Sequence, residues 1–168
     1  MKKIIIVLFL FTMILFINKG SEEYIIPDNA IRLRVIASSN TFEDQATKME
    51  IKNNIEDLLK KDLISVQNKI EAQELLNQKL PDIKNMINNY NLPYDIHYGQ
   101  NYFPEKSYKG IKYEAGMYES LVVTLGKGTG ENWWCVLFPP LCLMDASTSD
   151  TSDVDYQFFV KNMFEKYM

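Results

Sequence analysis

The side chains best suited to chemistry in this sequence are two cysteines, Cys135 and Cys142, and the single histidine, His97. The cysteines lie seven positions apart in the run GENWWCVLFPPLC, residues 130–142. A thiolate within hydrogen-bond reach of an imidazole could act as a nucleophile with its base. Cys135, however, lies in an unbroken apolar run, which disfavours the thiolate and limits access to it. We therefore predict no catalytic site, and keep a cell-envelope thiol hydrolase that uses Cys135 and His97 as the alternative.

The two cysteines also allow two structural interpretations. If a strand ends near Cys135 and the chain reverses at Pro139-Pro140, the two Cα atoms could reach the roughly 4.4–6.8 Å that a disulfide needs. Two buried thiols that behave as small apolar side chains are the other interpretation. A structural zinc site needs four Cys or His ligands, and the chain has three such residues. We therefore predict no metal site and no cofactor.

Aromatic residues next to turns are the candidate contacts with a partner. Trp133 and Trp134 are neighbours, so on a strand they point to opposite faces, and each could fill the core or form part of a binding surface. The glycine-rich segment 126–130 lacks the spacing of a phosphate-binding loop and is typical of a flexible hairpin tip. Residues 100–108 are expected to form a loop. These two segments add the candidates Tyr102, Phe103, Pro104, Tyr108 and Lys127.

The elements that would position these residues follow from the patterns along the chain. Residues 31–37 alternate and predict a strand with Leu33 and Val35 on one face and Arg32 and Arg34 on the other. A capping box at Thr41 begins a helix that is expected to end near residue 61. A second helix is predicted from about residue 68 to residue 90, with a kink or a break at Pro81.

The remainder of the chain predicts mostly strands, over residues 94–103, 118–125 and 132–138. We expect the last two to pair as a hairpin around the glycine-rich segment. The run WWCVLF shows no polar alternation, so we place it near the sheet centre, covered on both faces. Together the elements predict a single α+β domain with an antiparallel or mixed sheet and two long helices packed on one face.

The two ends of the chain differ in composition from its middle. Residues 4–17 form an apolar run after two lysines, and at 1.5 Å per residue they span about 21 Å, less than the ~30 Å of a bilayer core. Residues 1–20 are therefore predicted to be a signal peptide, which engages the membrane during export, or a short membrane anchor. Residues 21–145 then form the α+β domain, and residues 146–168 a linker and an amphipathic C-terminal helix.

The charge of the chain argues against nucleic acid as a partner. The net charge is −4, and residues 1–20 hold three lysines and no acidic residue, so without them it is −7. The sequence has no basic run. It therefore lacks the electrostatic footprint that nucleic-acid binding requires.

Four runs of the sequence resemble the stage II sporulation protein R family, the secreted signalling proteins of endospore-forming bacteria. They are IRLRVIASSNTFEDQ (31–45), HYGQNYFPEKSY (97–108), EAGMYESLVVTLGKGTG (114–130) and, most distinctive, NWWCVLFPPLC (132–142). Their order matches too, and the resemblance spans residues 27–145. The family commonly has Pro-Ala-Gly in place of Glu114-Ala115-Gly116 and Asn-Ser-Asp in place of Ser38-Ser39-Asn40, and the region after Leu143 diverges.

This resemblance implies a protein made in the forespore and exported across its membrane into the space between the two membranes. There it is expected to activate a membrane-embedded protease of the mother cell, which cuts an inactive sigma factor precursor. The family member is a ligand and not an enzyme, with the extracytoplasmic face of the protease as its partner and no small-molecule substrate. We expect the contact to be one patch built from residues 102–108 and 126–130.

Overall fold

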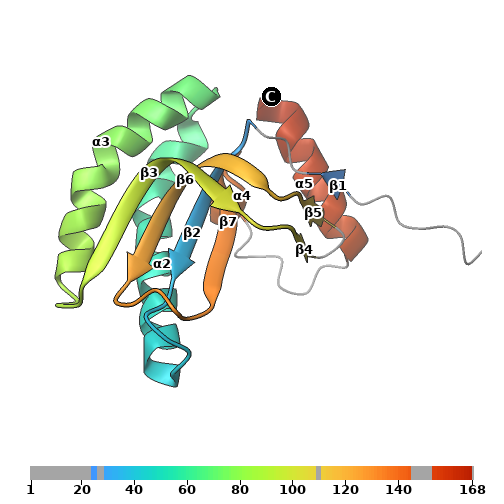
Figure 1. The fold of residues 1–168 in the computed structure, drawn as a ribbon. Coiled ribbons are helices and arrows are strands. Elements are labelled where there is room, and N and C mark those ends of the chain that lie inside the picture. The colour runs from blue at the N-terminus through green and yellow to red at the C-terminus, as the bar shows by residue number, and fades with distance from the viewer. Residues whose placement is uncertain (1–23, 26–28, 109–110, 145–152, 168) are drawn as a thin grey trace, which may run out of the picture.

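The computed structural model describes residues 24–25, 29–108, 111–144 and 153–167 of the chain. Its centre is a four-stranded sheet with the strand order β3-β6-β2-β7 (Figure 1). These strands are β3 (Tyr94–Phe103), β6 (Gly116–Leu125), β2 (Ile31–Ile36) and β7 (Asn132–Phe138). β2 and β6 are parallel, whereas β3 pairs with β6 and β7 pairs with β2 in the antiparallel sense. The predicted α+β class with a mixed sheet is confirmed.

The expected hairpin between β6 and β7 is wrong, because β2 lies between these two strands. Residues 126–131 instead cross the end of β2. The Gly130 N–H donates to the Ala37 carbonyl at 3.0 Å, and the Thr129 hydroxyl donates to the Ser38 carbonyl at 2.8 Å. β7 is consequently an edge strand and not a central one. Its apolar run is buried only over residues 136–138, and residues 132–135 are half-buried, so the predicted cover on both faces is incomplete.

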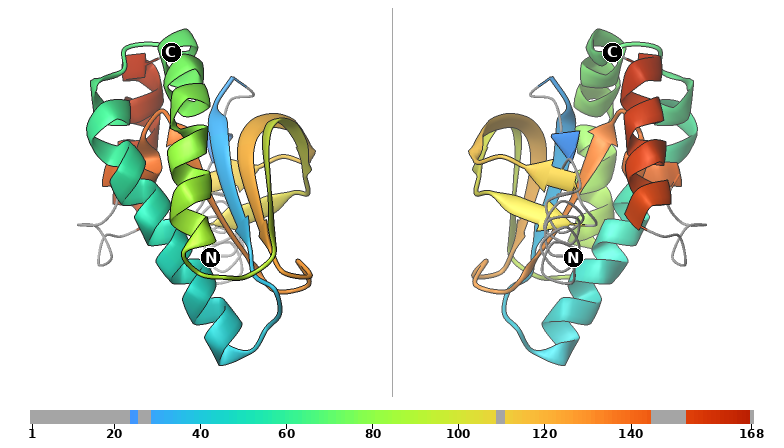
Figure 2. Two further views of the ribbon diagram at one scale, coloured as in Figure 1. Left: turned by 90° about the vertical axis from the view of Figure 1, so that its left-hand side faces the viewer. Right: turned by 90° about the vertical axis from the view of Figure 1, so that its right-hand side faces the viewer.

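Two long helices cover one face of the sheet (Figure 2). They are α2 (Phe42–Ser65) and α3 (Lys69–Asn88). The predicted cap at Thr41 is present, because Thr41 Oγ1 accepts from the Asp44 N–H at 3.3 Å. The structure adds a second cap, in which Asn68 Oδ1 accepts from the Glu71 N–H at 3.1 Å. α2 continues four residues past its predicted end, to Ser65.

Pro81 neither ends nor divides α3, so the predicted break is wrong. Pro81 is exposed, while Ile83 and Ile87 in the following turns are fully buried against the sheet. We attribute the continuity of the helix to this packing, which offsets the hydrogen bond that proline cannot donate.

The main core lies between the two helices and the sheet. It takes one face of each central strand, with Leu33 and Val35 from β2 and Leu121 and Val123 from β6 all at zero exposure. The helices supply the opposing layer, namely Ile51, Ile55, Leu59 and Leu63 from α2 and Ala72, Leu76, Ile83 and Ile87 from α3. The apolar side of each central strand therefore packs against the apolar stripes of the two helices, and these side chains form one core layer.

Three short strands and two further helices complete the described structure. β1 (Tyr24–Ile25), β5 (Ile111–Tyr113) and β4 (Lys106–Tyr108) form a small second sheet in that order. α4 (Leu141–Met144) follows β7, and α5 (Asp153–Tyr167) packs Val160, Met163 and Phe164 into a second core with Ala30, Val136 and Leu141. The predicted C-terminal helix therefore docks on its own chain.

Several predictions fall on residues outside the described ones, among them the signal peptide or anchor at 1–20 and the linker that begins at 146. Among the described residues, no helix combines the length and apolarity needed to cross a membrane.

Candidate interaction surface

The face of the sheet opposite α2 and α3 is only partly covered. Strand pairing aligns two rows of side chains on it, each with one residue from every strand. We call these eight residues the open sheet face: Asp95, Thr124, Ile36 and Asn132 in one row, and His97, Val122, Arg34 and Trp134 in the next. All eight are exposed or half-buried. The open sheet face is therefore a surface of the four strands that a partner could reach.

An arginine held by aromatic rings lies on this face. The Arg34 guanidinium carbon is 5.7 Å from the Phe103 ring centre and 5.5 Å from the Trp134 ring centre. The Lys106 ammonium lies 5.0 Å from the Trp134 ring centre. Such cation–π contacts hold charged groups over aromatic faces. Burial against the rings lowers the pKa of Arg34 from its ordinary value, although an arginine stays protonated at neutral pH.

Phe103 is the packing centre below this cluster. Its ring contacts Tyr118 edge-on at 6.1 Å and Trp134 at 5.2 Å, and it has no exposed surface. Arg32, 2% exposed, lies in the next row, with its guanidinium 3.3 Å from the Tyr118 ring centre. Both arginines of β2 therefore place their guanidinium groups against aromatic rings. The sequence signal for this arrangement is the alternation of arginine with apolar residues in IRLRVI, a pattern that by itself predicts only a strand.

The candidate contacts at residues 102–108 have different environments. The expected loop is wrong, because Tyr102 and Phe103 end β3 and Tyr108 belongs to β4. Tyr102 is 60% exposed and Pro104 is exposed, so both are accessible to a partner. Phe103 is fully buried and can act only through the residues packed on it.

The structure does not bring the two candidate segments together. Phe103 pairs with Gly116 at the start of β6, whereas Lys127 follows the end of that strand at Leu125. This ladder consists of ten residue pairs, so its two ends are nine steps apart, which corresponds to about 30 Å. A single patch formed by residues 102–108 and 126–130 is therefore not present. Lys127 is exposed at the far end, beside the turn at Ser38.

Trp133 and Trp134 point to opposite faces of β7, as their adjacency predicts. Trp134 shares a face with Arg34, its partner in the ladder, while Trp133 pairs with Val35 on the helix-covered face. The Lys52 ammonium of α2 lies 4.6 Å from the Trp133 ring centre. Both tryptophans are half-buried, so each is a packing residue that also reaches the surface.

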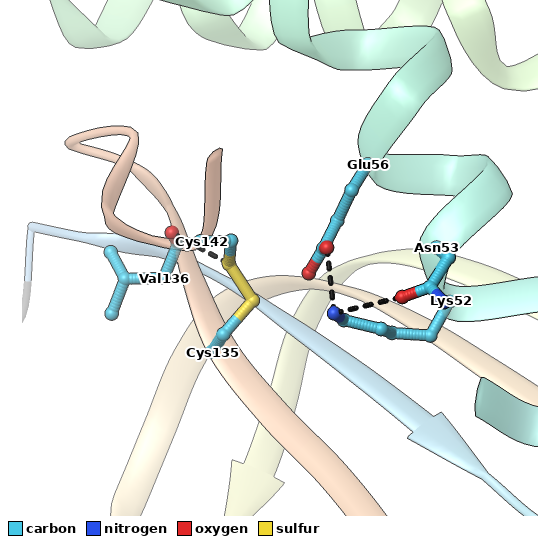
Figure 3. The surroundings of a disulfide bond; sticks show 6 residues. All are labelled: Lys52, Asn53, Glu56, Cys135, Val136 and Cys142. Carbon is cyan, nitrogen blue, oxygen red and sulfur yellow. Dashed lines mark hydrogen bonds and ion pairs between the residues drawn. A yellow bond between two sulfur atoms is a disulfide. The ribbon is translucent and has the colours of Figure 1, made fainter. Parts of the chain in front are cut away.

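Cys135 and Cys142 form a disulfide that holds α4 against β7 (Figure 3). Their Cα atoms are 5.8 Å apart, and the Cys142 sulfur lies 2.9 Å from the Val136 carbonyl oxygen. The chain reverses at Pro139-Pro140, which brings the two residues within reach. Glu56 of α2 lies beside the bond, and its carboxylate pairs with Lys52 at 2.7 Å.

The carboxyl group of Glu56 is next to both sulfur atoms, which is a spacing that could hold a metal ion. Metal binding by cysteine requires thiolates, and these sulfurs are bonded to each other. Burial raises the pKa of Glu56, although the hydrogen bond from Lys52 opposes this effect. A shallow pocket of about 270 Å³ opens here, lined by Lys52, Asn53, Glu56, Asp57, Lys60, Cys142 and Leu143. Two of its charged side chains, Lys52 and Glu56, form an ion pair across from the disulfide, which favours a structural role.

The alternative hydrolase site is not formed in this arrangement. Cys135 is in β7 and shares the helix-covered face with Leu33, whereas His97 is in β3 on the open sheet face. β6 and β2 lie between the two strands, so the lateral separation is three strand spacings, about 14 Å. Nδ1 of His97 instead hydrogen-bonds Asn101 Oδ1 at 2.9 Å. The nucleophile and base are thus held on opposite faces and far apart.

We expect removal of the disulfide to lower the free energy of unfolding by about 2.5 kcal/mol, the entropy of a closed loop of this length. The test is the double substitution Cys135→Ala with Cys142→Ala, measured by chemical denaturation under oxidising conditions. Under reducing conditions the original protein should lose the same stability and the double variant should not change. Equal stability of the two proteins under oxidising conditions would contradict the prediction.

A half-buried carboxylate joins α3 to the sheet on the helix-covered face. Glu119 of β6 accepts hydrogen bonds from the Tyr98 hydroxyl at 2.7 Å and from Gln73 at 2.9 Å, and it pairs with the Lys69 ammonium at 3.0 Å. Burial alone would raise the pKa of Glu119, but these three donors together outweigh it and lower the pKa. Burial and the Glu119 charge raise the pKa of the Tyr98 hydroxyl, which keeps it protonated as a donor.

The lowered pKa of Glu119 makes the free energy of unfolding depend on pH. Because the folded protein binds this proton less tightly than the unfolded chain, the stabilisation is complete above the ordinary glutamate pKa of about 4.3 and is lost as pH falls through the folded value. Glu119→Gln should cost about 1 kcal/mol at pH 7. The difference from the original protein should shrink as the pH is lowered toward 3. Glu114→Gln, at an exposed position, is the control and should show no such difference.

The fold and this surface define a class of protein: a disulfide-bonded α+β domain with an aromatic and cationic face suited to recognition. The family model for stage II sporulation protein R matches residues 27–148. The chain therefore belongs to the stage II sporulation protein R family and is a sporulation protein. The match covers the four-stranded sheet, α2, α3 and α4, and it ends before α5.

One curated relative extends this comparison. The chain is 37% identical over 139 residues to the stage II sporulation protein R of Bacillus subtilis (strain 168). The aligned region is 77% of this chain and 61% of that relative, so the chain spans about three fifths of the relative's length. No solved structure matches the chain.

Proposed function

We propose that this protein is an exported signal of endospore formation, which activates a membrane-embedded protease in the mother cell and so starts the processing of a sigma factor precursor. The observation that carries this proposal is the family match over residues 27–148. In this proposal the protein crosses the forespore membrane and acts in the space between the two membranes. Residues 4–17 would direct the export or remain as an anchor.

Two structural features support this proposal. Disulfides persist mainly in exported proteins, because the cytosol keeps thiols reduced, and the Cys135–Cys142 bond fits that setting. The second feature is the separation of Cys135 from His97, which favours a ligand over a thiol hydrolase. The partner in this proposal is the extracytoplasmic face of the protease, with no nucleic acid, cofactor or small-molecule substrate involved.

The decisive experiment reconstitutes the signal outside the cell. Purified residues 21–168 would be added to the outside of vesicles that hold the protease and its sigma factor precursor. We expect cleavage of the precursor to appear only when the protein is added, and to disappear after the protein is heat-denatured. Cleavage at the same rate without the protein would contradict the proposal, as would no cleavage with folded protein.

The same assay can locate the contact surface among the accessible candidates. Tyr102→Ala and Pro104→Ala alter one end of the β3–β6 ladder, Lys127→Glu alters the other end, and His97→Glu alters the open sheet face between them. We propose that the open sheet face is the contact, because it alone combines a partly exposed tryptophan with an arginine. His97→Glu should therefore reduce cleavage more than the substitutions at either end.

A further inference from the structure

The outer edge of β7 has two parts, a covered half at Val136 and an uncovered half at Asn132–Trp134. In an antiparallel pair, alternate residues direct their backbone groups toward the partner strand and away from it. The Ala37 N–H donates to the Glu131 carbonyl, and the Gly130 N–H donates to the Ala37 carbonyl. These two hydrogen bonds show which residues of β7 direct their backbone groups toward β2. Trp133 and Cys135 therefore bond to β2, and the backbone groups of Asn132, Trp134 and Val136 point outward.

The disulfide covers the second half of this edge. The Val136 carbonyl meets the Cys142 sulfur at 2.9 Å, and α4 runs past this part of the strand (Figure 3). Proteins commonly cover edge strands in this way, because an unpaired edge is a template for another strand. The cover ends before Trp134, since no described residue hydrogen-bonds to the outward backbone groups of Asn132 or Trp134.

Four cationic side chains lie around the uncovered half, with the carboxylates of Glu56 and Glu131 near two of them, although the chain as a whole carries a net charge of −4. Lys48 and Lys52 lie on the helix side, where Lys48 donates to the Glu131 carbonyl at 3.2 Å and Lys52 pairs with Glu56. Lys106 and Arg34 lie on the open side, around Trp134, and neither forms an ion pair with a described residue.

The charges of Lys48 and Lys106 interact across this edge. Burial lowers the pKa of Lys48, the nearby Glu131 opposes that effect, and Lys106 adds to it. The geometry places one ammonium group on each side of β7, that of Lys48 beside the Glu131 carbonyl and that of Lys106 over the Trp134 ring. An acidic side chain placed between them would relieve the repulsion between their charges.

We propose that the Asn132–Trp134 part of β7 accepts an added strand from a partner protein, and that this strand is an extended segment rich in acidic side chains. Four backbone groups, the N–H and C=O of Asn132 and Trp134, are available to pair with it, as in other cases of strand addition. Its side chains would alternate between Lys106 and Arg34 on one face and Lys48 and Lys52 on the other. The aromatic faces of Trp133 and Trp134 supply apolar contact to the same segment.

The test uses a capped ten-residue peptide of alternating glutamate and valine as the probe, with an alternating lysine and valine peptide for comparison. Both tryptophans of the chain lie at this edge, so their fluorescence reports binding directly. We expect the acidic peptide to change the fluorescence and to protect the Asn132 and Trp134 amides from hydrogen exchange, while the basic peptide does neither. No change with the acidic peptide, or equal binding of both, would overturn the proposal.

Two substitutions sharpen this test while leaving the core unchanged. Lys106→Glu should weaken binding of the acidic peptide about tenfold, whereas Lys84→Glu, an equal change of charge at an exposed position of α3, should not affect it. Asn132→Pro removes one outward donor that the ladder to β2 does not use, and should also weaken binding. Equal effects of Lys106→Glu and Lys84→Glu would overturn the proposal.

Discussion

Phe103→Ala is expected to lower the free energy of unfolding by about 4 kcal/mol, within the range for removing a buried aromatic side chain. The Phe103 ring has no exposed surface and packs edge-on against Tyr118 and Trp134. Its loss would leave a cavity beneath the guanidinium groups of Arg32 and Arg34, both within 6 Å of the ring centre. Chemical denaturation followed by tryptophan fluorescence would measure the change.

The neighbouring residue provides the matched control for this prediction. Tyr102 lies in the same strand but is 60% exposed, so Tyr102→Ala should cost less than about 1 kcal/mol. If the two substitutions destabilise the protein equally, Phe103 is not the packing centre of the open sheet face. The pair also compares two adjacent aromatic residues whose different roles the sequence pattern does not reveal, since Phe103 packs in the core and Tyr102 reaches solvent.

Gly130→Ala is the second large effect, with an expected loss of about 3 kcal/mol from overpacking. A Cβ atom at position 130 would lie only 2.2 Å from the Ser39 carbonyl oxygen and 2.6 Å from its carbonyl carbon. These are backbone atoms, so relief of the clash would have to move the turn at residues 38–40. That turn is joined to Thr129 and Glu131 by hydrogen bonds, which would be strained together.

Gly116→Ala is the control for this substitution. Its added Cβ would meet only the ring of Tyr118, at 3.3 Å, and a side chain can adjust where backbone cannot. We expect a change below about 1 kcal/mol from it. Thermal and chemical denaturation of both variants would test the difference. Equal stability of Gly130→Ala and the original protein would show that the two turns are not in the close contact described above.

The crossing of residues 126–131 over the end of β2 also has a functional consequence. It places the glycine-rich segment against Ser38-Ser39-Asn40, two runs that both belong to the matched family region. The contact fixes where β7 begins, because the Glu131 N–H donates to Asn40 Oδ1 at 2.7 Å just before Asn132. These runs therefore position the edge that we propose to accept a partner strand.

The sequence alone determined the features that depend on neighbours along the chain. The cap at Thr41 and the faces of the strand at residues 31–37 could both be predicted, because each follows from hydrogen bonds or side-chain directions within a few residues. The opposite orientations of Trp133 and Trp134 follow from the same period-two rule. The α+β class follows from the order of these elements.

The tertiary structure decided everything that depends on which distant segments meet. Only the strand order shows that β2 separates β6 from β7, that Cys135 and His97 are on opposite faces, and that residues 102–108 and 126–130 are at opposite ends of one ladder. The physical reason is that a strand carries the same alternation whether it is central or at an edge. Its position is fixed by long-range packing and pairing, which local patterns do not encode.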